Sequence, residues 1–229
     1  MAALRAGLVR RAPTAGRTGA LRPGFHLEPG MRVGLFGGSF NPAHEGHAHV
    51  AETALLRLGL DRVIWLVSPQ NPLKSAAEMA PLQDRLASAA AVARGPSMIV
   101  SDAESRMGSR YTLDTLRILR ARFPGVRFVW VMGADNLAGF HRWRGWAQIF
   151  REVPLVVVAR PGALMKSRFA PAARRFAHAR RDARWAGVLA QGEPPLWIYL
   201  PAPLNSASST AIRAGLRPAR GAEPPQRNP

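Results

Sequence analysis

The chain contains no cysteine. This absence excludes disulfide bonds, a thiolate nucleophile and any metal site built from sulfur ligands. It also fits a reducing compartment, so we expect a cytoplasmic protein. With 229 residues and 47% hydrophobic content, the chain is long enough for one domain with a sizeable core.

Long apolar runs and lysine are also scarce. No stretch of about 18 uninterrupted apolar residues occurs, so the sequence predicts no membrane-spanning helix. Lys74 and Lys166 are the only lysines, although the net charge is +18. That charge would suit a nucleic-acid-binding protein. Because the arginines are spread along the chain rather than gathered in one block, we favour instead an arginine-biased composition with a pocket for polyanionic nucleotides.

Strand and helix patterns alternate along the chain. Short apolar runs bounded by turn residues predict strands at Arg32–Phe36, Arg62–Val67, Met98–Val100, Arg127–Met132, Pro154–Ala159 and Leu196–Leu200. Helical spacing predicts helices at His44–Leu58, Pro81–Ala93, Ser109–Arg122 and near Trp146–Phe150, with an irregular helical excursion within Pro161–Gly192. This alternation predicts a single α/β domain with a doubly wound parallel sheet, in which ligands bind at the carboxyl ends of the strands.

The two ends of the chain lack such patterns. We expect residues 1–30 to be a poorly ordered extension. Because Met31 directly precedes the first strand, an extension or a start codon placed too far upstream explains this segment better than a transit peptide does. The domain is then expected to span residues 31–216. The tail, residues 217–229, is expected to fray.

The most informative segment is residues 37–47, GGSFNPAHEGH. It joins a predicted strand to a predicted helix, so Gly37 and Gly38 lie in the turn and His44 and His47 open the helix. Glycines let a backbone approach a ligand closely, and the first turn of a helix presents N–H groups and partial positive charge. Histidines three apart share one helix face. The pattern therefore indicates a phosphate site that both imidazoles can reach.

A second anion site is indicated near the C-terminus, where residues 205–213 read NSASSTAIR. Ser208, Ser209 and Thr210 suit a helix N-cap, and Arg213 follows one turn later. Hydroxyl groups, backbone N–H groups and a guanidinium would converge there on an anion.

These two segments together resemble the signatures of the nucleotidyltransferase superfamily, and the first is most similar to that of bacterial nicotinate-nucleotide adenylyltransferases. The resemblance implies a Rossmann-like fold and the reaction of ATP with nicotinate mononucleotide, giving nicotinate adenine dinucleotide and pyrophosphate. It implies catalytic roles for His44, His47 and Arg213, and ATP binding by Gly37, Gly38, Ser39, Phe40, Ser208, Ser209 and Thr210. The attacking acceptor phosphate is already ionised at neutral pH, so no general base and no covalent nucleophile are expected.

Further segments resemble the acceptor-binding elements of that family. Lys74 ends a Pro-rich loop and is expected to meet the acceptor phosphate. Tyr111 and Thr112 begin a helix whose N-terminus would face the nicotinate carboxylate. Asp135 would bind ribose hydroxyls, and Trp143 would stack on the pyridine ring. Mg²⁺ is expected to arrive with ATP, bound through phosphates and water, because no carboxylate cluster is visible to hold it.

Some features depart from the family pattern or leave alternatives open. Asn41 stands where many relatives carry Asp, and Leu73 replaces a common His. A sister enzyme acting on nicotinamide mononucleotide or phosphopantetheine is the nearest alternative; Tyr111, Thr112 and Trp143 argue against phosphopantetheine. A basic, non-catalytic RNA- or ribosome-binding module is a more distant one, and the first turn lacks the GxGxxG spacing of dinucleotide oxidoreductases. The sequence leaves the oligomeric state open and is compatible with a homo-oligomer.

Overall fold

A computed structural model describes residues 23–70, 79–159, 167, 169–202 and 209–215. In this part of the chain, seven parallel strands form one sheet in the order β3-β2-β1-β4-β5-β7-β6. The strands are β1 (Arg32–Gly38), β2 (Arg62–Val67), β3 (Met98–Ser101), β4 (Arg127–Gly133), β5 (Leu155–Val158), β6 (Arg180–Arg181) and β7 (Trp197–Leu200). The strand order reverses between β1 and β4, which is the switch point where such sheets bind ligands. The predicted doubly wound α/β fold is confirmed.

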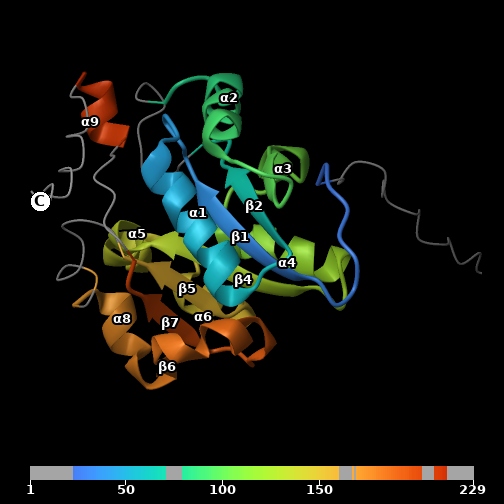
Figure 1. Ribbon diagram of the computed structural model, residues 1–229, viewed down its shortest axis with the longest axis vertical. Helices are drawn as coiled ribbons and strands as arrows, with labels where there is room; N and C mark the ends of the chain where they lie inside the picture. The colour runs from blue at the N-terminus through green and yellow to red at the C-terminus, as the bar shows by residue number, and fades with distance from the viewer. Residues whose placement is uncertain (1–22, 71–78, 160–166, 168, 203–208, 216–229) are drawn as a thin grey trace, which may run out of the picture.

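Helices cover both faces of the sheet (Figure 1). One face packs against α1 (Glu45–Leu58), α2 (Leu82–Val92) and the 3₁₀ helix η4 (Ala183–Gln191). The other packs against α3 (Ala103–Arg106), α4 (Thr112–Arg122), α5 (Ala134–Gly139), η2 (Phe140–Arg142), α6 (Trp146–Glu152), α8 (Pro171–Arg175) and η3 (Ala177–Ala179). A further helix, α9 (Ser209–Arg213), lies beside the N-terminal end of α1.

Side-chain alternation along the strands builds the two cores. On β4, Trp130 and Met132 point toward α4 and α6, whereas Val129 and Val131 point toward α1. All four are buried. A strand covered on both faces must be apolar on both, which is why the predicted strands read as nearly continuous apolar runs.

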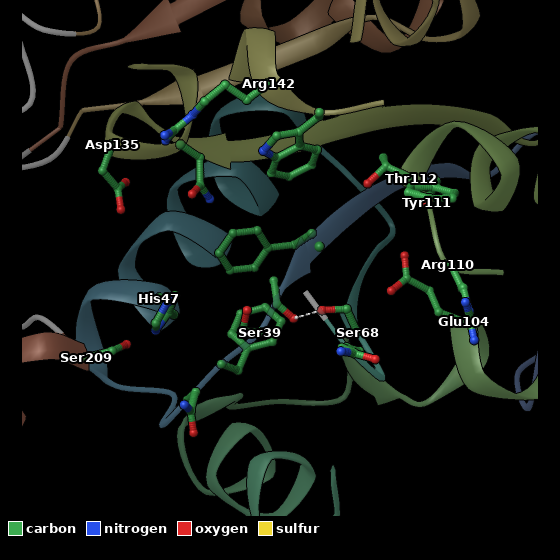
Figure 2. A pocket seen from close by; sticks show the side chains of 18 of the residues that line it. Ser39, His47, Ser68, Glu104, Arg110, Tyr111, Thr112, Asp135, Arg142 and Ser209 are labelled. Carbon is green, nitrogen blue, oxygen red and sulfur yellow. Dashed lines mark hydrogen bonds between the residues drawn. The ribbon is translucent and has the colours of Figure 1, made fainter. Parts of the chain in front are cut away.

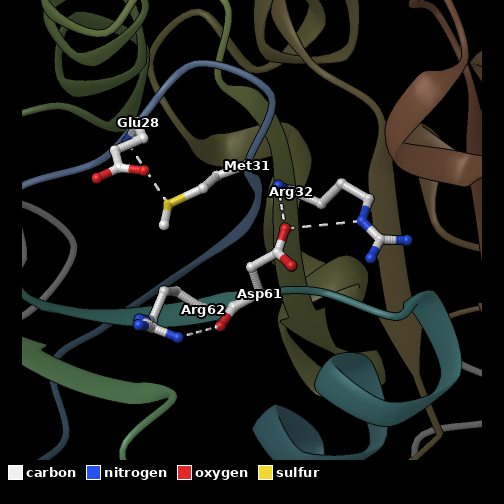
Figure 3. Close-up of polar contacts among 5 residues, drawn as sticks. All are labelled: Glu28, Met31, Arg32, Asp61 and Arg62. Carbon is white, nitrogen blue, oxygen red and sulfur yellow. Dashed lines mark hydrogen bonds and ion pairs between the residues drawn. The ribbon is translucent and has the colours of Figure 1, made fainter.

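Polar contacts set the starting points of β1 and β2 (Figure 3). The Asp61 carboxylate accepts the Arg32 backbone N–H at 2.7 Å, and the Asp61 backbone N–H donates to the Arg32 carbonyl at 2.8 Å. Arg62 in turn donates to the Asp61 carbonyl at 2.8 Å. The two strands then run in register as far as Gly38 and Val67, so their carboxyl ends reach the same edge of the sheet.

The domain begins earlier than Met31. The sequence predicts a poorly ordered extension over residues 1–30, but within residues 23–30 Leu27 is buried and Phe25 stacks on Phe123 at 5.9 Å. The Pro23 carbonyl accepts a hydrogen bond from Ser101. The expected boundary therefore moves to the N-terminal side, because apolar side chains in this segment have core partners that no local pattern reveals.

Predicted and observed element boundaries differ at a few other places. The helix expected from Ser109 begins at Thr112, because Tyr111 has an extended backbone. The two-residue strand β6 was missed, since two arginines carry no strand signal. The described part of the excursion within 161–192 consists of α8, η3, β6 and η4 rather than one helix. No described helix is both long enough and apolar enough to cross a membrane.

Candidate functional site

A cavity of about 510 Å³ opens at the carboxyl ends of β1, β2, β3 and β4 (Figure 2). All the predicted site residues that the structure describes line it: Gly37, Gly38, Ser39, Phe40, His44, His47, Tyr111, Thr112, Asp135, Trp143, Ser209, Thr210 and Arg213. Lys74 and Ser208 lie outside the described residues. Segments up to about 170 residues apart in sequence thus share one cavity, as the motif pairing requires.

Gly37 and Gly38 lie at the end of β1, paired with β2, rather than in the turn as predicted, because the strand extends two residues further. These glycines are needed for packing as well as for ligand approach. A Cβ atom on Gly37 would lie 2.4 Å from the Trp130 ring, and one on Gly38 would lie 3.1 Å from the Phe40 ring. Phe40 has a positive φ of 46° and is buried against Phe36 and Trp65. This apolar anchor fixes a backbone conformation that L-residues rarely adopt.

His44 and His47 are held by reciprocal bonds at the start of α1. Nδ1 of His44 accepts the Gly46 backbone N–H at 3.1 Å, and Nδ1 of His47 accepts the His44 backbone N–H at 3.2 Å. Each Nδ1 is therefore an acceptor, which assigns the hydrogen of the neutral ring to Nε2. The two imidazoles both line the cavity, with their ring centroids 3.9 Å apart.

The second predicted anion-binding segment is bonded directly to the first. On α9, the Ser209 hydroxyl donates to the Pro42 carbonyl at 2.9 Å and the Arg213 guanidinium donates to the Asn41 carbonyl at 2.5 Å. Ser209 and His47 lie at the same end of the cavity in Figure 2. Imidazoles, hydroxyl groups and a guanidinium therefore surround one volume, a donor set that suits a polyanionic chain such as a triphosphate.

Arg85 on α2 holds together two loops beside the cavity. The sequence predicts no role for it. It is 2% exposed and donates to four carbonyls, those of Ser39, Ser68, Pro69 and Ala80, at 2.7–3.0 Å. Burial lowers its pKa, but a guanidinium stays charged at neutral pH. No acidic partner accompanies it within the described residues. Arg85 thus fastens the loop after β1 to the loop after β2.

The other end of the cavity is aromatic and basic. The Trp143 ring packs edge-on against Phe140 and Trp130, with centroids 5.0 and 6.2 Å apart, and lines the cavity. The Arg144 guanidinium lies 4.5 Å from the centre of the Tyr111 ring. A flat ring held by other rings offers a rigid stacking surface for an aromatic ligand.

Three buried polar side chains lie next to the aromatic end of the cavity: those of Glu104, Ser109 and Thr115. Thr115 on α4 donates to the Glu104 carboxyl at 3.1 Å and is 2.9 Å from the Ser109 hydroxyl. Desolvation raises the pKa of Glu104 to about 7, against a smaller lowering by the Thr115 bond. Glu104 belongs to a helix of only four residues, so no periodicity marked it in the sequence.

The acids of the cavity do not form a metal cage. Asp135 and Glu104 both line it, but no group of three or more His, Asp or Glu side chains is placed for a metal anywhere in the described residues. Such a donor set fits a cation that is carried by phosphate ligands and water.

Comparisons with known proteins show the family and the fold. The cytidylyltransferase-like family model matches residues 35–215. A probable nicotinate-nucleotide adenylyltransferase of Caulobacter sp. (strain K31) is 69% identical, over 80% of this chain and 97% of that protein. One of Cereibacter sphaeroides (strain ATCC 17025 / ATH 2.4.3) is 56% identical over the same shares. The fold is similar to that of Plasmodium falciparum nicotinic acid mononucleotide adenylyltransferase complexed with NaAD, with a TM-score of 0.59, 15% identity, and coverage of 80% of this chain and 83% of that one.

Proposed function

The chain belongs to the nicotinate-nucleotide adenylyltransferase family, within the cytidylyltransferase-like proteins, and on that premise we propose how its cavity works. The enzyme transfers the adenylyl group of ATP to nicotinate mononucleotide, giving nicotinate adenine dinucleotide and pyrophosphate. One observation carries the assignment of the site: the paired imidazoles of α1 and the Ser209–Arg213 helix meet in one cavity whose far end is aromatic and basic.

The reaction needs alignment more than acid–base chemistry. An oxygen of the acceptor phosphate attacks the α-phosphorus of ATP, and the bond from that phosphorus to the β-phosphate oxygen breaks. The attacking phosphate has a second pKa of about 6, so it has already lost its proton at neutral pH. Preorganised donors around the α-phosphorus then supply the main acceleration.

The ATP end of the cavity provides those donors. In this proposal, His44 and His47 donate from Nε2 to oxygens of the α- and β-phosphates as negative charge moves toward the leaving group. Ser39 and the backbone of Gly37 and Gly38 position the triphosphate. Pyrophosphate is held by the C-terminal segment, through Ser209, Thr210, Arg213 and, from outside the described residues, Ser208.

The opposite end receives the mononucleotide. Trp143 stacks on the pyridine ring, and the N-terminus of α4 at Tyr111 and Thr112 faces its carboxylate. Asp135, exposed in the first turn of α5, accepts hydrogen bonds from ribose hydroxyls. Lys74, beyond the described residues, remains our choice for the acceptor phosphate.

The proposal includes Mg²⁺ and a cytoplasmic location. ATP-dependent nucleotidyl transfer generally uses a divalent cation, and Mg²⁺ would supply charge neutralisation at the phosphates. The cation would be held mainly by the phosphates of ATP and by water.

A three-acceptor assay tests the function. The purified chain would receive ATP and Mg²⁺ with nicotinate mononucleotide, nicotinamide mononucleotide or phosphopantetheine, and both pyrophosphate and the dinucleotide product would be measured. We expect nicotinate mononucleotide to give the highest kcat/KM. A higher value for either other acceptor would reassign the substrate. RNA binding without pyrophosphate release would favour the non-catalytic alternative.

A further inference from the structure

Glu104 is a buried acid that the proposed chemistry does not use. Only 5% of the residue is exposed, and its Oε1 accepts the Thr115 hydroxyl. Its second oxygen, Oε2, has no hydrogen-bond partner among the described residues. Glu104 lines the cavity, and Figure 2 shows its carboxyl group directed into the cavity beside Tyr111 and Thr112. An acceptor ring stacked on Trp143, with its substituent toward α4, would bring that substituent to this oxygen.

The charged groups around Glu104 do not neutralise it directly. Arg106, on the same helix, is paired with Asp102 at 2.6 Å. Arg110, on the loop before α4, and Arg144, after η2, line the cavity, but neither is among the causes of the pKa shift of Glu104, which are burial and the Thr115 hydrogen bond. Asp135 lines the cavity from α5, on its opposite side in Figure 2. The protonation state of the Glu104 carboxyl therefore depends on its burial and on the ligand that faces it.

The protonation state of Glu104 decides what it can bind. A protonated carboxyl donates one hydrogen bond, whereas a carboxylate only accepts. The carboxylate of a nicotinate ring only accepts, so it needs a donor opposite. The carboxamide of a nicotinamide ring carries N–H donors, so it can face an ionised carboxylate. Since burial raises the pKa of Glu104 to about 7, both forms are populated near neutral pH.

We propose that Glu104 is a specificity-determining residue that contacts the substituent of the acceptor's pyridine ring, favouring the acid acceptor when protonated and the amide acceptor when ionised. The inference rests on the proposed function, because it needs the pyridine ring at this end of the cavity. Binding of the acid acceptor above pH 7 then takes up one proton from solvent, which the two carboxyl groups share.

Competition between acceptors across pH tests the inference. The ratio of kcat/KM for nicotinate mononucleotide to that for nicotinamide mononucleotide would be measured from pH 6 to pH 8.5 in the whole protein. The acceptor phosphate titrates in both substrates, so its effect cancels in the ratio. We expect the ratio to fall about tenfold or more from pH 6 to pH 8.5, as for one pKa unit of differential interaction. In Glu104→Gln, which cannot titrate, the ratio should not change with pH.

A matched control and a second measurement make the result decisive. Asp114→Asn changes an exposed carboxylate on α4 and should keep the wild-type pH profile. If Glu104→Gln does not fold, calorimetric titration of wild type in buffers of different ionisation enthalpy still tests proton uptake with the acid acceptor at pH 8. A wild-type ratio independent of pH, an unchanged slope in a folded Gln variant, or no proton uptake would overturn the inference. Absence of product with both pyridine acceptors would instead overturn the proposed function.

Discussion

The two ends of the cavity are built from different kinds of contact. At the ATP end, functional side chains bond to the backbone: His44 and His47 accept N–H groups, while Ser209, Arg213 and Arg85 donate to carbonyls. At the acceptor end, side chains bond to one another as well as to backbone carbonyls: Thr115 donates to the Glu104 carboxyl, and exposed arginines line the cavity nearby.

This difference matches what each end has to recognise. A triphosphate presents the same charge whichever acceptor is used, so donors fixed to a rigid backbone serve it well. Acceptors with the same pyridine skeleton differ in one substituent, and a titratable side chain can distinguish donor from acceptor there. The ATP end is therefore expected to be sensitive to geometry, and the acceptor end to pH.

The largest effect is expected at Arg85, which joins the loop after β1 to the loop after β2. Arg85→Gln would leave buried carbonyls without donors and should lower the free energy of unfolding by about 4 kcal/mol, since each lost partner costs about 1–3 kcal/mol and water replaces some. Chemical denaturation would measure this loss. Arg94→Gln, which removes an exposed pair with Glu45, should cost under about 1 kcal/mol. Equal stabilities of the two variants would contradict the role given to Arg85.

Removing one imidazole should affect turnover rather than stability. His47→Ala is expected to lower kcat by about 10²–10³, as for loss of one preorganised donor to the transition state. Steady-state kinetics would measure it, with His178→Ala, an exposed histidine outside the cavity, as the control. Turnover near that of the control would remove His47 from the catalytic groups.

Glu104 should make stability depend on pH. Its folded pKa of about 7 lies above the ordinary value of 4.5, so the folded state holds the proton more tightly than the unfolded state. Stability from this group is fully present below about pH 4.5 and is lost as pH rises toward 7. The free energy of unfolding of Glu104→Gln, relative to wild type, should rise by about 2.5 kcal/mol from pH 5 to pH 8. A constant difference in denaturation experiments at the two pH values would refute this.

The smallest effect is expected from the stacking surface. Trp143→Ala should weaken binding of the mononucleotide about tenfold, equivalent to the roughly 0.5–1.5 kcal/mol of an aromatic pair. ATP affinity should stay unchanged. Titration of each ligand separately would measure both; equal weakening would argue against ring stacking at this position.

Local motifs made much of this site predictable, whereas long-range partners did not. Gly37, His44 and His47 belong to one continuous strand–turn–helix segment. Their spacing along the chain alone therefore predicts that they lie close together. Arg85 could not be assigned, because it sits among exposed neighbours on α2 and its four carbonyl partners come from other segments.

The same limit applies to the rest of the fold. The six predicted strands were found because strands buried on both faces have continuous apolar runs. Residues 23–30 and β6 depend on tertiary contacts instead, and a pattern read along the chain carries no information about those.

The attachment of α9 to the Asn41–Pro42 carbonyls also has a consequence for biosynthesis. A ribosome delivers the histidine turn early and the Ser209–Arg213 helix only after nearly the whole domain has been translated. On the proposed function, nascent chains shorter than this lack Ser209 and Arg213, the groups assigned to pyrophosphate. We expect such a chain to reach full affinity for ATP only once α9 has emerged.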